Sequence, residues 1–147
     1  MSKDKSLYLV AVDGSEWSDR AAAFAVEKAS KENARIIFIT VIPWSGFQPL
    51  TMDEIAYRPI DKGIEEDLAK KNVLDPLYDK YKDTKIDIST EYHWGNPSEV
   101  IHDRAKKLKA AQVFVGRRGR SKISDLILGS VANTLAHTLG VPITLVP

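Results

Sequence analysis

A glycine-rich, basic segment between residues 116 and 130 carries the residue types most suited to binding an anion. Gly116 and Gly119 lack a Cβ, so backbone amides there can approach a ligand closely. Gly129 and Ser130 come directly before a helix-period segment, and a helix N-terminus offers an anion free amides and a favourable dipole. Four cations lie between these glycines: Arg117, Arg118, Arg120 and Lys122. The combination suits a polyphosphate, although a glycine-rich loop with solvated arginines would have the same composition.

Apolar runs that alternate with helix-period segments indicate how this segment is positioned. Five runs predict strands, at Leu7–Val12, Ile36–Ile42, Ile86–Tyr92, Gln112–Val115 and Val141–Val146. Apolar stripes between them predict four helices, which contain Trp17, Ala21, Phe24, Ala25 and Ala29; Leu68, Val73, Leu74 and Leu77; Ile101, Ala105 and Leu108; and Leu128, Val131, Leu135 and Leu139. We therefore expect an α/β fold with one domain over residues 1–147. It is a single doubly wound five-stranded parallel sheet, of order 3-2-1-4-5, with helices on both faces.

The ends of the first and fourth predicted strands are the expected position of a ligand. In doubly wound folds, ligands bind beyond the carboxyl ends of the strands, where the strand order reverses. The two strands end at Val12-Asp13 and Val115-Gly116, so Asp13 and the glycine-rich segment should meet there. Asp13 could also cap the turn into the first helix.

A long connection, Pro43–Pro59, follows the second predicted strand and contains Trp44, Phe47 and Tyr57. It exceeds the length at which structureless loops become uncommon. It could be a lid that orders when a ligand binds, an interface, or a packed surface loop.

Composition excludes several classes of function. The 147 residues carry a formal net charge of +1, which argues against nucleic-acid binding driven by bulk charge. The absence of cysteine excludes disulfides and thiolate sites. No apolar stretch is long enough to span a membrane, and no signal peptide is evident, which predicts a cytoplasmic protein. The P-loop and dinucleotide fingerprints are both missing.

Catalytic chemistry has little support in the sequence. His93, His102 and His137 lack metal-ligand spacing, and Ser15 and Ser18 have no histidine nearby in sequence. We therefore assign no catalytic residue and no direct metal ligand, and expect a protein that is not an enzyme.

The spacing Gly116-x2-Gly119-x9-Gly129-Ser130 resembles the nucleotide loop of the universal stress protein family, in its ATP-binding branch. Three further motifs resemble the same family in order along the chain: Asp13-Gly14-Ser15-x2-Ser18, Gly95-x-Pro97-x3-Ile101-x3-Ala105 and Val141-Pro142-Ile143. The sequence departs from the family pattern at Gln112 and Thr144, outside the loop.

The resemblance implies an adenine-nucleotide alpha-hydrolase-like fold that binds ATP, or another adenine nucleotide, with Mg²⁺ on the phosphates. Carried onto this sequence, it places Val12 and Asp13 beside the adenosine, with Asp13 facing the ribose or a phosphate-bound Mg²⁺, and Val41 at the adenine edge. The segment from Val115 through Gly116 and Gly119 would wrap the ribose and phosphates. The phosphates would be held by Gly129, Ser130 and Val131, with charge added by Arg118 and Arg120.

Three functions are compatible with this sequence. The first is a stress-response protein that binds ATP and acts as a binding and signalling module. The second is slow ATP hydrolysis or adenylyl transfer at the same site. The third is a nucleotide-free dimeric interaction protein whose basic loop binds the acidic surface of a partner. We also expect a homodimer through the apolar edge strand Val141–Val146, and neither a nucleic-acid nor a membrane partner.

Overall fold

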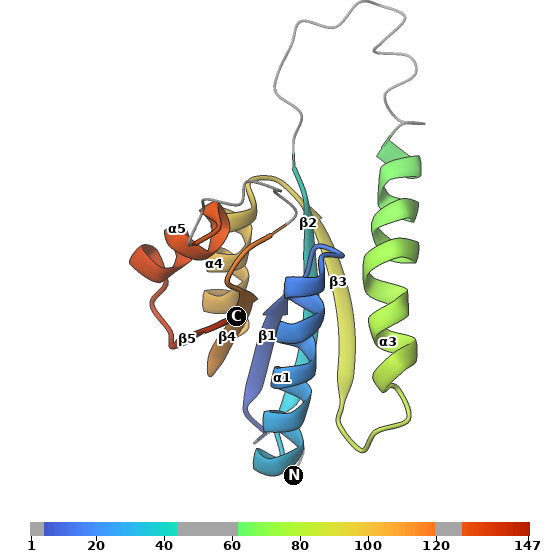
Figure 1. Cartoon of the computed structure of the whole chain (residues 1–147), viewed down its shortest axis with the longest axis vertical. Coiled ribbons are helices and arrows are strands. Elements are labelled where there is room, and N and C mark those ends of the chain that lie inside the picture. Colours follow the sequence, from blue (N-terminus) through green and yellow to red (C-terminus); the bar gives the residue numbers. More distant parts are fainter. Residues whose placement is uncertain (1–4, 44–61, 120–127) are drawn as a thin grey trace, which may run out of the picture.

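A five-stranded parallel sheet forms the centre of the molecule (Figure 1). The computed structural model describes residues 5–43, 62–119 and 128–147. Its strands are β1 (Leu7–Ala11), β2 (Arg35–Ile42), β3 (Ile88–Trp94), β4 (Gln112–Gly116) and β5 (Ile143–Val146). They lie in the order β3-β2-β1-β4-β5, which confirms the predicted fold class and strand order. Of the long connection that follows Pro43, residues 44–59 lie outside the described residues, as do Arg120 and Lys122.

Helices cover both faces of the sheet. One face carries α1 (Glu16–Glu32) and a second helical segment, which comprises residues 62–69, the π-helical turn η2 (Lys70–Leu74) and α3 (Asp75–Tyr81). The other face carries α4 (Pro97–Lys107) and α5 (Ser130–Thr138). No helix in the described parts of the chain is long and apolar enough to cross a membrane.

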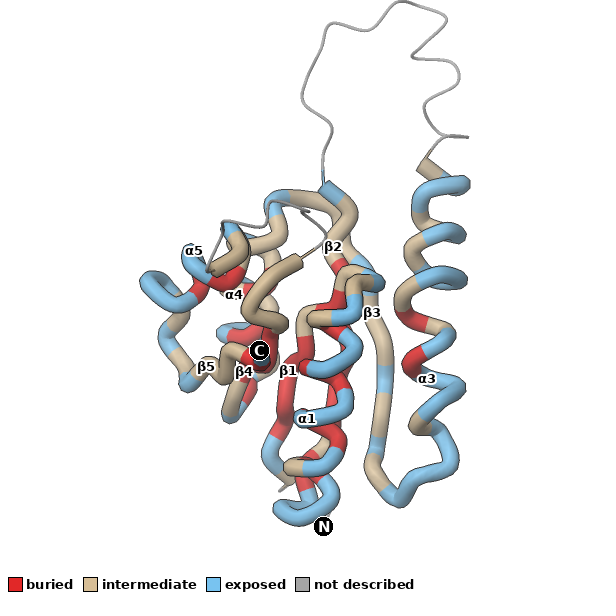
Figure 2. Tube along the Cα trace, in the orientation of Figure 1, coloured by how far each residue is buried: buried red, intermediate tan, exposed pale blue. Residues whose placement is uncertain are grey.

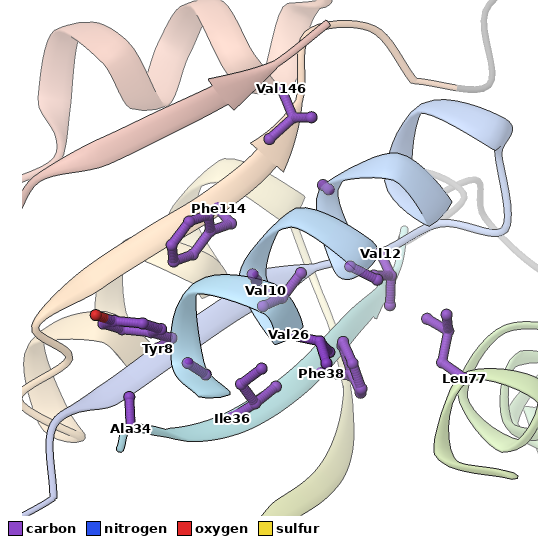
Figure 3. Close-up of a cluster of buried hydrophobic side chains, with 14 of the residues drawn as sticks. Tyr8, Val10, Val12, Val26, Ala34, Ile36, Phe38, Leu77, Phe114 and Val146 are labelled. Atoms are coloured by element: carbon purple, nitrogen blue, oxygen red, sulfur yellow. The ribbon is translucent and has the colours of Figure 1, made fainter. Parts of the chain in front are cut away.

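Each face of the sheet has its own hydrophobic core. Under α1, the side chains of Val10, Phe38 and Phe114 pack against the alanines of that helix (Figure 3). On the opposite face, Leu9 and Ile39 pack against Ile101 of α4 and Leu135 of α5. Figure 2 shows these buried residues concentrated along the central strands. Because successive strand residues point to opposite faces, near-continuous apolar strands supply both cores at once.

Two helix starts follow their sequence signals. Asn96 caps α4, since its Oδ1 accepts a hydrogen bond of 3.2 Å from the amide of Glu99, and Pro97 occupies the first turn. Ser15 caps α1 by accepting a hydrogen bond from the amide of Ser18. Side-chain caps of this kind fix the point at which a helix begins.

The predicted apolar stripes are wrong at two positions. Leu68 is 50% exposed, whereas Leu74 and Leu77 of the same predicted stripe are buried. The turn η2 begins after Leu68. Its π-helical winding is wider than that of an α-helix, so residues before the turn point in a different direction from the one that a regular helix would give them. Phe24 of α1 is 47% exposed, although its ring still lies 6.1 Å from that of Phe114.

Candidate functional site

The exit of β1 is a turn built by polar side chains. Asp13 Oδ1 accepts a hydrogen bond of 2.9 Å from the amide of Ser15, and the Asp13 amide donates to Ser18 Oγ at 3.2 Å. Gly14 between them has φ +83°, a left-handed conformation that glycine adopts without steric cost. The Asp13-Gly14-Ser15-x2-Ser18 motif therefore orients the Asp13 carboxylate and starts α1. The hydrogen bond from the Ser15 amide to Oδ1 supports the predicted role of Asp13 in capping the turn into α1. The second carboxylate oxygen, Oδ2, takes no part in this turn.

The exit of β4 is packed tightly against the first turn of α1. A Cβ on Gly116 would lie 2.8 Å from the carbonyl carbon and the Cβ of Trp17. Real Cβ atoms do not come so close to backbone, so Gly116 allows helix and strand to pack here. This gives Gly116 a structural reason to be glycine, in addition to the predicted contact with a ligand.

Arg117 joins three elements through its backbone. Its amide donates to Val146 O of β5 at 2.8 Å, and its carbonyl accepts from the amide of Gly129 at 2.8 Å. Gly129 is in turn the N-cap residue of α5, where its carbonyl accepts from the amide of Asn133. The ends of β4 and β5 and the start of α5 are therefore held in one fixed arrangement.

Gly119 lies between the β1 exit and the start of α5. A Cβ on Gly119 would be 3.0 Å from Asp13 Oδ2, and a Cβ on Gly129 would be 3.3 Å from the Gly119 amide nitrogen. The structure therefore brings Asp13, Gly119, Gly129 and the adjacent Ser130 together at the strand-order reversal. A carboxylate acceptor, partly exposed glycine backbone and a helix N-terminus at one place can bind a ligand with both hydroxyl and anionic groups.

The valines among the predicted site residues have buried or partly buried side chains. Val12 and Val115 are buried, whereas Val41 and Val131 pack partly exposed against the core on the α4–α5 face. Any contact of Val12 or Val115 with a ligand would therefore be made through the backbone. Val41 lies near the end of β2, in register with His93 of β3.

The described arginines of the loop point toward Trp17. The guanidinium carbon of Arg118 lies 5.6 Å from the centre of the indole ring, and that of Arg117 lies 5.9 Å from it. Arg20, one turn along α1, is also over this ring, at 4.7 Å. The sequence left open which arginine faces a ligand, and it gave no reason to single out Trp17 or Arg20.

A second polar cluster connects residues 62–69 to the end of β3, and it was not predicted. Glu66 accepts hydrogen bonds from Tyr92 OH at 2.7 Å and from Trp94 Nε1 at 3.1 Å. Both hydrogen bonds lower the pKa of Glu66, and the one from Tyr92 has the larger effect. The hydrogen bond between Tyr92 and Glu66 also raises the pKa of Tyr92. The partners are 26 and 28 residues apart, so no local pattern could have revealed them.

A third cluster lies on the other face of β3. Glu91 accepts two hydrogen bonds from Arg104 of α4, at 2.8 and 3.1 Å, and its Oε1 lies 3.0 Å from His93 Nε2. Burial raises the pKa of Glu91, but the hydrogen bonds and charges of Arg104 and His93 outweigh it and lower the pKa overall. Within the described residues, no group of three His, Cys, Asp or Glu side chains could hold a metal ion.

Comparison with known sequences matches this chain to one family. The model of the Universal stress protein family matches residues 8–147. The chain is 28% identical over 143 residues to Universal stress protein YxiE of Bacillus subtilis (strain 168), which covers 94% of this chain and 96% of that protein. It spans only 43% of the length of Universal stress protein Rv2005c of Mycobacterium tuberculosis, at 28% identity over 92% of this chain.

Solved structures show the same fold. Universal stress protein UspA from Lactobacillus plantarum superposes with a TM-score of 0.78, at 19% identity over 97% of both chains. A universal stress protein crystallised in complex with cAMP superposes with a TM-score of 0.64, at 25% identity over 97% of this chain and 96% of that chain. With a family model that matches nearly the whole chain, this protein belongs to the universal stress protein family.

Proposed function

We propose that this protein binds an adenine nucleotide, ATP with Mg²⁺ on its phosphates, at the carboxyl ends of β1 and β4. It would act in the cytoplasm as a binding and signalling module of the stress response. In this proposal Asp13 faces the ribose or the phosphate-bound Mg²⁺, and the Val41 backbone meets the adenine edge. The loop Val115–Gly119 wraps the ribose and phosphates, and Gly129, Ser130 and Val131 hold the phosphates at the start of α5.

The observation that carries this proposal is the position of Gly119 between a carboxylate and a helix N-terminus. Its missing Cβ would be 3.0 Å from Asp13 Oδ2, while its amide nitrogen lies beside Gly129, the cap of α5. A nucleotide needs an acceptor for its ribose hydroxyl groups and, a few ångströms away, a binding site for its anionic phosphates. The Asp13 carboxylate and the start of α5 supply these two groups. The related structure in complex with cAMP, at 25% identity, supports an adenine nucleotide as the class of ligand.

A binding role fits the chemistry of Asp13 better than a catalytic role does. Its Oδ1 is engaged by the amide of Ser15, and no ion pair or side-chain hydrogen bond to a second acid or a histidine is made by Asp13 among the described residues. Activation of water for hydrolysis normally needs a positioned base whose proton transfer is supported by a neighbour. Slow ATP hydrolysis or adenylyl transfer, with Asp13 and Mg²⁺ as participants, remains the competing proposal.

Identification of bound nucleotide is the direct test. The freshly purified protein is denatured, and any released small molecule is identified by mass spectrometry. Calorimetry with ATP, cAMP and adenosine then ranks the ligands on the nucleotide-free protein. We expect ATP or another adenine nucleotide to be released and to rebind. Failure of all three ligands to bind would contradict the proposal, whereas rapid conversion of ATP to ADP would favour the enzymatic alternative.

A further inference from the structure

Three arginine side chains surround one indole ring at the β4 end of α1. The guanidinium carbons of Arg20, Arg118 and Arg117 lie 4.7, 5.6 and 5.9 Å from the centre of the Trp17 ring. Each distance is within the range of a cation–π interaction, so the ring supports all three cations. The cluster formed by Trp17, Arg20, Arg117 and Arg118 is called the arginine cluster below.

The arginine cluster has little compensating charge. The only ion pair it makes with a described carboxylate joins Arg20 to Glu16 at 3.7 Å, and both of those side chains are more than half exposed. Such an exposed pair contributes little. Within the described part of the chain, Arg117 and Arg118 make no ion pair. Three cations that share one ring repel one another, so an anion bound among them would relieve the repulsion.

Two buried donors in the cluster lack acceptors. The Nε atoms of Arg117 and Arg118 are both buried, and neither has a hydrogen-bond partner among the described residues. Buried polar groups in proteins are nearly always hydrogen-bonded, so two such donors side by side indicate a missing acceptor.

The backbone holds the cluster in place before any ligand arrives. Trp17 is fixed because its main chain packs on Gly116, which has no room for a Cβ. Arg117 is fixed by hydrogen bonds of its amide to Val146 and of its carbonyl to Gly129. Because the main chain that carries these side chains is already fixed, binding a ligand costs the entropy of ordering side chains and not that of ordering the loop at Arg117.

We propose that the arginine cluster binds a phosphate-type oxyanion. Guanidinium groups match the geometry of phosphate oxygens and bind them through paired hydrogen bonds, and several cations suit an ion with more than one charge. Trp17 and Arg20 of the cluster lie on α1, whereas Arg117 and Arg118 lie on the loop that follows β4. The same loop contacts the start of α5, where the Arg117 carbonyl accepts a hydrogen bond of 2.8 Å from the Gly129 amide, so the cluster adjoins the proposed phosphate-binding position at Gly129 and Ser130. The phosphate group could come from the far end of a bound nucleotide or from a separate inorganic phosphate.

The test follows the emission of Trp17 while inorganic tripolyphosphate is added. In a Trp44→Phe, Trp94→Phe variant Trp17 is the only tryptophan, because the chain has three. We expect a saturable change in its emission, with at least tenfold weaker binding when Arg117→Gln and Arg118→Gln are added. The matched control, Lys106→Gln with Lys107→Gln, also removes two positive charges, from the last turn of α4. It should leave the affinity unchanged.

Calorimetry on the unaltered chain repeats the titration without tryptophan substitutions. The proposal is overturned by the absence of saturable binding in both measurements, or by equal weakening in the arginine and lysine variants. Further titrations with ATP and adenosine identify the source of the phosphate. Competition between ATP and tripolyphosphate assigns the site to the nucleotide's phosphates, and independent binding of both assigns it to a separate anion. Binding of tripolyphosphate without binding of ATP or adenosine would contradict the proposed function and leave this inference intact.

Discussion

The carboxylate of Asp13 occupies the side of Gly119 on which any other residue would carry its Cβ, with Oδ2 3.0 Å from that position. Asp13 follows β1 and Gly119 follows β4, so this contact joins the two strands between which the strand order reverses. Gly119 is therefore required for a close approach between an acidic side chain and the glycine-rich loop. Substitutions at this position should change the site directly.

Replacement of Gly119 by alanine should weaken ATP binding by roughly tenfold, or ~1.4 kcal/mol. The added methyl group would push the Asp13 carboxylate away from the loop and would narrow the approach to the backbone. Calorimetry with ATP measures the loss. Gly140→Ala is a suitable control, because a Cβ there would meet nothing within 4 Å. Unchanged ATP affinity in the Gly119 variant would place the nucleotide elsewhere. Gly129→Ala would test the site less clearly, because a Cβ on Gly129 would also press on the backbone of Arg118 and Gly119 and could distort the loop itself.

Replacement of Gly116 by alanine should lower the free energy of unfolding by about 1–3 kcal/mol, the usual range for overpacking. The new methyl group would overlap the main chain of Trp17, which can yield only if α1 moves off the sheet.

Gly63 should respond in the opposite way to Gly116, because it lies in the helical residues 62–69 with open space around its Cβ position. Gly63→Ala should raise the free energy of unfolding by about 0.5–1 kcal/mol. Urea denaturation measures both, and a stabilised Gly116 variant would contradict the packing argument.

The fold could be predicted because its signals are local. Five apolar runs, the Asn96-Pro97 start of α4 and the Asp13–Ser18 motif each depend on residues close together in sequence, and the rules for parallel sheets then leave few strand orders. Leu68 was assigned wrongly because the pattern assumed regular α-helical winding, which η2 interrupts.

Contacts between distant residues could not be predicted in the same way. Gln112 and Thr144 look like two separate departures from the family pattern, yet Gln112 Nε2 donates a hydrogen bond to Thr144 Oγ1 across β4 and β5. The arginine cluster and the hydrogen bonds of Glu66 depend in the same way on which elements pack together. For the site itself, the sequence indicated Asp13, Gly119 and Gly129, but it could not show that the side chains of Arg117 and Arg118 turn toward α1.

Glu91 should make the stability of the protein depend on pH in the acid range. Its folded-state pKa is lowered from the usual 4.5, so the charged form is favoured in the folded protein. The resulting stabilisation is fully present above pH 4.5 and is lost as the pH falls through the lower folded-state pKa. Glu91→Gln should lower the free energy of unfolding by about 1–2 kcal/mol at pH 7, since one partner of Arg104 is removed from a partly buried pair.

Denaturation of the wild type and the Glu91→Gln variant at several pH values between 7 and 3 checks this expectation. The difference between the two proteins should shrink as the pH falls below 4.5. Glu99→Gln is a control on the exposed first turn of α4 and should change stability little. A difference that stays constant down to pH 3 would show that the charge of Glu91 does not contribute.

The edge strand β5 should join two copies of the chain into a homodimer. It pairs only with β4 among the described strands, and Pro142 O and Val146 O accept hydrogen bonds from that side. Because backbone groups alternate in direction along a strand, those of Ile143 and Leu145 point away from the sheet. No charged residue lies within β5 to discourage pairing, and antiparallel pairing about a two-fold axis would satisfy these groups in both copies.

Light scattering on the purified protein should give a mass near twice 16.4 kDa. Leu145→Arg should shift the mass toward the monomer, because it places a positive charge from each copy in the paired strands. Leu145 also packs partly against the core under α4 and α5, so loss of packing could act on the monomer as well. Leu145→Ala separates the two effects, since it removes the same packing without adding charge and should remain dimeric. The prediction fails if the wild type is monomeric at micromolar concentration, or if the alanine and arginine variants dissociate equally.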